Sequence, residues 1–171
     1  GCTTPGPLLL TAYGSYGTSR TTRHDPFLTA LIDHGMTYAV AHVRGGGEKG
    51  RAWHDGGRVL NKPNALADLF SCLNHLEECG IAAPGNVALI GGSAGGTLMA
   101  AALNQAPERF CAAVLEAPFV DVLASMINPD LPLTASDRSE WGDPLTSETV
   151  LACIRSYSPY ENLTAQTYPP V

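Results

Sequence analysis

The sequence has little of what would place a chain in a membrane, on nucleic acid or around a metal. Its 171 residues contain no run of about 18 consecutive apolar residues. The opening GCTTPGPLLL has neither the basic region nor the long apolar stretch of a signal peptide. Acidic residues outnumber basic ones by 16 to 10, whereas nucleic-acid binding requires clustered Lys and Arg. These shortages predict a protein that binds neither membrane nor nucleic acid.

Cysteine is also used sparingly. The five cysteines are odd in number, widely scattered and without a CxxC pair: Cys2, Cys72, Cys79, Cys111 and Cys153. Neither a zinc site nor a disulfide framework is therefore predicted. We expect reduced core thiols in a cytoplasmic protein.

Strand and helix signals alternate over the first 117 residues. Asp25 followed by Pro26 is typical of a helix start. Asn64 predicts the cap of a long amphipathic helix that ends at Gly80. Buried strands are expected at 8–12, 36–43, 86–90 and 111–117, with helices at 26–34, 64–80 and 94–106 between them. This order predicts an α/β fold, with a parallel sheet, right-handed crossovers and helices on both faces.

The last third of the chain gives weaker signals. Residues 125–144 are loop-like, and a helix is expected around 147–155. The closing YPPV at 168–171 is typical of the entry to another strand.

A serine among four glycines follows the apolar run NVALI. Gly91, Ser93 and Gly95 of GGSAGG fit the pattern G-x-S-x-G. A serine on a sharp turn from strand to helix has strained backbone geometry, and the flanking glycines avoid collisions with the neighbouring strand and helix. Such a turn raises the hydroxyl above the carboxyl ends of parallel strands and places the Ala94 amide at a helix N-terminus. This context predicts a nucleophilic serine rather than close packing of small residues alone.

A second glycine pattern suggests a different function. Gly45, Gly47 and Gly50 fit G-x-G-x-x-G after a strand, and Asp68 follows at about the distance of a ribose-binding acid. However, RAWHDGGRVLNKPN cannot form the immediate helix that would hold a pyrophosphate. Asp68 also falls inside a helix rather than after a second strand. The sequence therefore argues against a nucleotide site.

The histidines lie on the wrong side of Ser93 for a complete catalytic triad. In this architecture an acid and then a histidine follow the serine. All five histidines precede it: His24, His34, His42, His54 and His75. Asp121 follows the serine, but without a histidine it has nothing to orient. We therefore expect residues 1–171 to be part of a longer catalytic domain and to be inactive alone.

Several stretches together resemble one known family. They are YGSYG at 13–17, HVRGGGEKGRAWHDGG at 42–57, GGSAGGTLMAAALNQAPERF at 91–110, APFVDVLASM at 117–126 and SYSPYENL at 156–163. They resemble the catalytic domain of the prolyl oligopeptidase family, with oligopeptidase B as the nearest branch and the prolyl endopeptidase-like proteins as the alternative. The resemblance implies a partial α/β-hydrolase fold that acts on short peptides without cofactor or metal. It also implies that an N-terminal β-propeller over the active site, and the catalytic Asp and His, lie outside this chain.

The resemblance also implies roles for individual residues. Ser93 is the nucleophile, and the Tyr13 hydroxyl acts with the Ala94 amide as the oxyanion hole. A phenol held by a tight glycine-bearing loop is a suitable donor. Oligopeptidase B cleaves after Arg or Lys, and Asp137 and Glu140 in ASDRSE are the candidate acids for that basic side chain. A solvated loop is the alternative interpretation of these two charges.

Three functions remain open on these observations. The first is a serine oligopeptidase that cleaves short peptides. The second is an esterase or thioesterase of the prolyl endopeptidase-like type, and the third is a non-catalytic remnant or binding module. Turnover of peptide amides against thioesters separates the first two.

Overall fold

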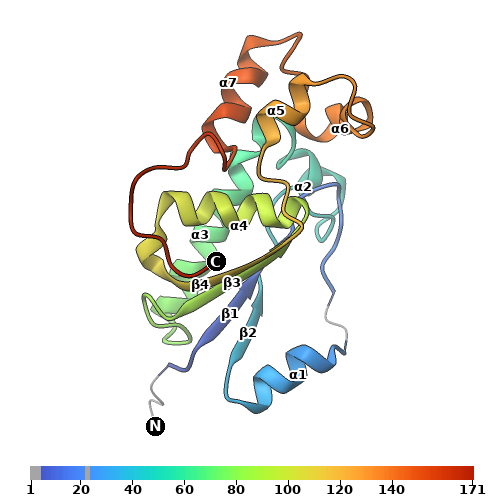
Figure 1. The fold of residues 1–171 in the computed structure, drawn as a ribbon. Coiled ribbons are helices and arrows are strands. Elements are labelled where there is room, and N and C mark those ends of the chain that lie inside the picture. The colour runs from blue at the N-terminus through green and yellow to red at the C-terminus, as the bar shows by residue number, and fades with distance from the viewer. Residues whose placement is uncertain (1–4, 22–23) are drawn as a thin grey trace.

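A four-stranded parallel sheet lies at the centre of the computed structural model, which describes residues 5–21 and 24–171 (Figure 1). The strands are β1 (Leu8–Thr11), β2 (Thr37–Val40), β3 (Val87–Gly92) and β4 (Phe110–Glu116). They lie in the order β2-β1-β3-β4, and every neighbouring pair is parallel. The predicted parallel sheet is therefore confirmed.

Helices lie on both faces of the sheet. In Figure 1, α1 (Pro26–Asp33) is on one side, and α3 (Pro63–Glu78) and α4 (Ala94–Gln105) are on the other. The chain crosses from β1 to β2 in one direction along the sheet, and from β2 to β3 and from β3 to β4 in the other. Right-handed crossovers in opposite directions place their helices on opposite faces, so this arrangement follows from the strand order. The main core fills the space between the sheet, α3 and α4, with Leu8, Leu10, Leu69, Leu73, Val87, Leu89 and Met99 among its members. In the described part of the chain, no helix is both long and apolar enough to cross a membrane.

The two predicted helix starts had different outcomes. The side chain of Asp25 accepts a hydrogen bond from the Phe27 amide, so the cap of α1 is confirmed. In contrast, α3 begins at Pro63, and the side chain of Asn64 donates to the Gly56 carbonyl. Proline has a fixed φ that suits the first helical position, and it lacks the N–H that would otherwise need a partner there. The prediction that Asn64 caps this helix is therefore wrong.

A small helical layer lies above α3 and α4 in Figure 1. It consists of α5 (Val122–Ile127), α6 (Thr134–Trp141) and α7 (Glu148–Tyr157). The helix expected around 147–155 is thus confirmed, but the loop-like interpretation of 125–144 is wrong for the helical residues 125–127 and 134–141. These helices are stabilised by a second core that includes Val122, Met126, Trp141, Ile154 and Tyr157. Trp141 is only 1% exposed, which shows that tertiary packing rather than helical periodicity determines α6.

The sheet edges differ from the expectation of buried strands. β2 is an edge strand, and its side chains are exposed or half-buried, so the prediction that it is buried is wrong. β4 forms the other edge, and YPPV is not a strand in the structure. The Pro170 carbonyl nevertheless accepts a hydrogen bond of 2.9 Å from the Ala113 amide of β4. The closing segment therefore runs beside this strand.

The cysteines are less buried than predicted. Cys72 and Cys153 are half-buried free thiols, and Cys79 and Cys111 are exposed free thiols. The prediction of core thiols is therefore wrong for Cys79 and Cys111, whereas Cys72 and Cys153 pack against the two cores without being fully buried. Cys2 lies outside the described residues.

Candidate active site

Ser93 occupies a strained turn between β3 and α4. Its backbone has φ +51° and ψ −124°, and its side chain is exposed. Such backbone angles are costly for a residue with a Cβ and persist only where the surroundings enforce them. A Cβ on Gly91 would lie 2.6 Å from the Gly95 carbonyl oxygen, and a Cβ on Gly95 would lie 2.8 Å from that of Ala12. The expected steric need for both glycines is therefore confirmed.

The Ala94 amide lies at the start of α4. As the first helical residue it has no acceptor within its own helix, and it donates to no other atom of the described residues. The Ser93 carbonyl instead accepts from the Gly96 and Thr97 amides and so begins the helix. A free amide at a helix N-terminus favours a negative charge beside it.

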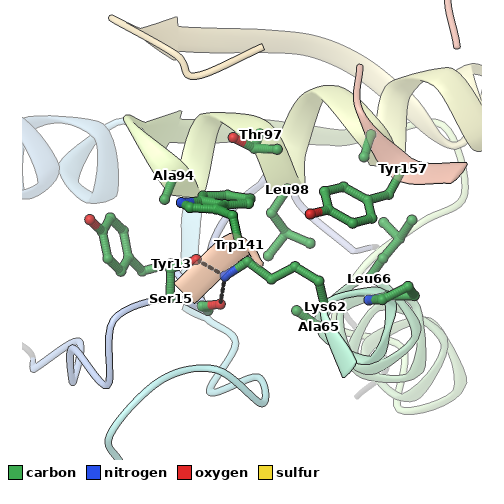
Figure 2. Close-up of a pocket in the computed structure, with 13 residues that line it drawn as sticks. Tyr13, Ser15, Lys62, Ala65, Leu66, Ala94, Thr97, Leu98, Trp141 and Tyr157 are labelled. Atoms are coloured by element: carbon green, nitrogen blue, oxygen red, sulfur yellow. Dashed lines mark hydrogen bonds between the residues drawn. The ribbon is translucent and has the colours of Figure 1, made fainter. Parts of the chain in front are cut away.

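Tyr13 follows β1 and packs against the first turn of α4. A Cβ on Gly95 would lie 3.3 Å from Cδ2 of Tyr13, so the two residues are neighbours. Figure 2 shows Tyr13 and Ala94 at the same end of a pocket, opposite Tyr157. The Arg20 guanidinium lies 5.6 Å from the centroid of the Tyr13 ring. Because β1 and β3 are adjacent parallel strands, their carboxyl ends bring Tyr13 and Ser93 to the same edge.

The pocket in Figure 2 is small. Its volume is about 30 Å³, and its lining includes Ala94, Lys62, Trp141 and Tyr157, with the Trp141 ring beside Ala94. A space of this size holds about one water molecule.

Asp137 is half-buried on α6 and lies beside Tyr16. Burial raises the pKa of Tyr16 to about 12, and the negative charges of Asp137 and Glu140 add to this effect. Tyr16 is therefore neutral at physiological pH, and its hydroxyl oxygen accepts a hydrogen bond of 2.8 Å from Trp141 Nε1. Asp137 is thus near the edge of the second core and is not fully buried.

Glu140 has a different environment from Asp137. It is 2% exposed, and its carboxylate oxygens accept hydrogen bonds from Lys62 Nζ at 2.6 Å and His54 Nε2 at 2.7 Å. Because an ionised carboxylate only accepts, His54 carries a proton on Nε2. The solvated-loop interpretation is therefore wrong for Glu140. Both of its carboxylate oxygens already accept hydrogen bonds inside the protein. The environments of Asp137 and Glu140 therefore differ, although the sequence made both candidates for the same role.

Lys62 is the residue that the sequence analysis missed. It is 6% exposed, and its ammonium lies 4.2 Å from the centroid of the Trp141 ring. It also donates a hydrogen bond of 2.6 Å to Ser15 Oγ. Lys62 and Glu140 are 78 positions apart in the sequence. A lone lysine before a proline is normally a surface residue, so no local pattern distinguishes it.

The buried pair predicts a specific dependence of stability on pH. Burial alone would raise the pKa of Glu140, but Lys62 and His54 outweigh it and lower that pKa below its usual value. A lowered folded-state pKa stabilises the protein fully above the unfolded value of about 4.3, and this contribution is lost as the pH falls through the folded-state value.

We expect the free energy of unfolding, measured with urea between pH 3 and 7, to fall less steeply in acid for K62M/E140Q than for the wild type. Glu78→Gln at an exposed position is the control and should keep the wild-type slope. Equal slopes for K62M/E140Q and the wild type would contradict the prediction.

The second glycine pattern has a structural role. Arg44 donates to both carboxylate oxygens of Asp68, at 2.7 and 2.8 Å, and its backbone amide donates to the same group. A Cβ on Gly45 would lie 2.1 Å from the Gly14 carbonyl oxygen. Asp68 is thus engaged with Arg44, and the loop is pressed against the Tyr13 loop, which agrees with the argument against a nucleotide site.

The described residues do not complete a triad around Ser93. No histidine among residues 5–21 and 24–171 makes a hydrogen bond to it. Asp121 caps α5 by accepting from the Ala124 amide, which is a structural role. In the same ranges, no group of three or more His, Cys, Asp or Glu side chains is arranged to hold a metal ion.

Comparison with known proteins identifies the family. The model of the Prolyl oligopeptidase family matches residues 23–171. The chain belongs to this family. Its sheet and helices are accordingly those of an α/β-hydrolase fold, as the resemblance implied.

Individual relatives are similar over almost the whole chain. Dipeptidyl aminopeptidase BI of Pseudoxanthomonas mexicana is 45% identical over 163 residues, which are 95% of this chain and 22% of that protein. A prolyl endopeptidase-like protein of Xenopus laevis is 46% identical over 163 residues, which are 95% of this chain and 23% of that protein. The structure of oligopeptidase B from Trypanosoma brucei with covalently bound antipain, in its closed form, has a TM-score of 0.92 and 42% identity, and the match covers 96% of this chain and 23% of that one. The chain therefore spans less than a quarter of the length of these members of the prolyl oligopeptidase family.

Proposed function

We propose that Ser93 is the nucleophile of a serine-type peptidase that hydrolyses short peptides. The observation that carries this proposal is the strained, exposed serine beside the Ala94 amide, which donates to no acceptor among the residues that the structure describes. Membership of the prolyl oligopeptidase family supports it. The antipain bound covalently to the related oligopeptidase B is also what a nucleophilic site would produce.

In the proposed reaction, Ser93 Oγ forms a bond to the carbonyl carbon of the substrate. A general base takes the hydroxyl proton, and we assign this role to a histidine elsewhere in the full-length protein. The base then returns the proton to the leaving amine, and water hydrolyses the acyl-enzyme by the same steps. The resemblance also leads us to propose a β-propeller over the site in that protein.

We assign the oxyanion hole to Tyr13 and Ala94. The developing negative charge would accept one hydrogen bond from the Tyr13 hydroxyl and one from the Ala94 amide. Donors fixed before the reaction stabilise the transition state without having to reorganise. The packing of Tyr13 against Gly95 supports this assignment, because Gly95 lies in the same turn as Ala94.

The proposal is tested with the full-length gene product. A fluorophosphonate probe should label the wild-type protein covalently at Ser93, and turnover of peptide amides should accompany the labelling. Labelling with turnover of thioesters but not peptides would indicate the esterase or thioesterase alternative. Absence of labelling in the folded full-length protein would refute a nucleophilic Ser93 and favour a binding module.

We further propose that Asp137 favours substrates with Arg or Lys before the cleaved bond. Its half-exposed carboxylate can form a bidentate pair with a guanidinium. Asp137→Asn should lower kcat/KM for arginyl substrates about tenfold relative to neutral ones, as expected for one partly exposed charged contact. Asp130→Asn at an exposed position before α6 is the control and should leave this ratio unchanged. An unchanged ratio in Asp137→Asn would contradict the assignment.

A further inference from the structure

We propose that Lys62 is a positioning residue that holds the Tyr13 loop in the geometry of the oxyanion hole. This inference rests on the proposed function, because it concerns the same oxyanion. Lys62 Nζ donates to Ser15 Oγ at 2.6 Å and reaches the Gly14 carbonyl oxygen at 3.5 Å. These two residues directly follow Tyr13. Figure 2 shows the ammonium pointing at this loop from the side opposite the Tyr13 ring.

The other contacts of Lys62 fix the ammonium itself. Nζ donates to Glu140 Oε1 at 2.6 Å, and it lies 4.2 Å from the centroid of the Trp141 ring. An ammonium has three donors, and Ser15, Gly14 and Glu140 supply three acceptors. Hydrogen bonds of the Lys62 ammonium therefore connect Glu140 on α6 to the loop that carries Tyr13.

The loop also contacts the segment that follows β2. A Cβ on Gly14 would lie 2.7 Å from Val43 Cγ2, and the Gly17 amide donates to the Gly45 carbonyl at 3.0 Å. The backbone beside Tyr13 thus contacts both the segment that contains Val43 and Gly45 and the side chain of Lys62. A shift of about 1 Å in a catalytic group is enough to reduce a rate substantially.

Stability alone does not require a charge at this position. Replacing a buried ion pair by well-packed residues of similar volume is often neutral or stabilising. A buried Lys62–Glu140 pair therefore needs another explanation, and its contacts to Ser15 and Gly14 provide one. The charge orients a flexible loop by directional hydrogen bonds, which an apolar side chain does not make.

The test is a double-mutant cycle in the full-length protein. K62M/E140Q removes both charges without leaving a buried carboxylate unpaired. We expect it to lower kcat about tenfold with little change in KM. Tyr13→Phe alone should lower kcat about 100-fold. In the Tyr13→Phe background, K62M/E140Q should cause no further loss, since Lys62 acts through Tyr13.

Two results would overturn the inference. One is a full tenfold loss from K62M/E140Q in the Tyr13→Phe background, which a general structural role would cause. The other is unchanged kcat in K62M/E140Q. If the double variant does not fold, Ser15→Ala replaces it, because this variant keeps the ion pair. We expect Ser15→Ala to lower kcat a few-fold in the wild-type background and not at all in the Tyr13→Phe background. If Ser93→Ala retains activity or fluorophosphonate labelling, the proposed function itself fails, whatever the cycle gives.

Discussion

Ser93→Ala is expected to lower kcat of the full-length protein by about 10⁴- to 10⁶-fold, with little change in KM. The substitution removes the oxygen that would form the covalent bond to the substrate. It leaves the Ala94 amide and Tyr13 in place, so substrate binding and a small residual rate persist. Steady-state turnover of peptide amides over a range of substrate concentrations separates kcat from KM.

The control for this prediction is Ser71→Ala. Ser71 is exposed on α3, away from the turn between β3 and α4. Both variants lose one hydroxyl, but only Ser93→Ala should lose activity and fluorophosphonate labelling. If Ser93→Ala keeps more than about one hundredth of the wild-type kcat, a directly attacking serine is ruled out, since that loss is far smaller than a missing nucleophile causes.

Local sequence signals predicted the parts of the site that are local in the structure. Gly91, Ser93 and Gly95 lie within one turn, and their pattern together with the apolar runs on either side indicates a strand, a sharp turn and a helix. Tyr13 is distant in sequence, yet it follows β1 as Ser93 follows β3. Parallel pairing of these strands brings the two ends together. The order of elements along the chain does not show that β1 and β3 are neighbours, so the role of Tyr13 was implied only by the family resemblance.

The surroundings of Glu140 could not be predicted in the same way. Asp137 and Glu140 are three residues apart on α6, but one is half-buried and the other is buried against Lys62. Their difference depends on how α6 packs, and α6 was not expected at all. The weak amphipathicity of TASDRSEW gives little helical signal, and the burial of Trp141 stabilises the helix instead.

Alanine at position 91 is expected to lower both activity and stability. Its Cβ would lie 2.6 Å from both the Gly95 carbonyl oxygen and Met99 Cγ, so β3 and α4 must move apart. Overpacking of this kind costs about 1–3 kcal/mol of unfolding free energy. The same displacement moves Ser93 and the Ala94 amide relative to each other, and a misplacement of about 1 Å costs roughly 10²-fold in rate. We therefore expect Gly91→Ala to lose about 100-fold in kcat and to unfold at lower urea concentration.

Alanine at the adjacent position provides a matched control. A Cβ on Gly92 would meet the Glu116 carbonyl oxygen at 3.3 Å, a contact that a shift of a few tenths of an ångström relieves. Gly92→Ala should therefore keep kcat within a few-fold of the wild type, although it lies closer to Ser93 in the sequence. Equal losses in the two variants would show that flexibility of the glycine-rich stretch, rather than close packing of β3 against α4, determines the geometry of Ser93. A loss in Gly91→Ala alone shows that this packing holds the serine in its strained turn.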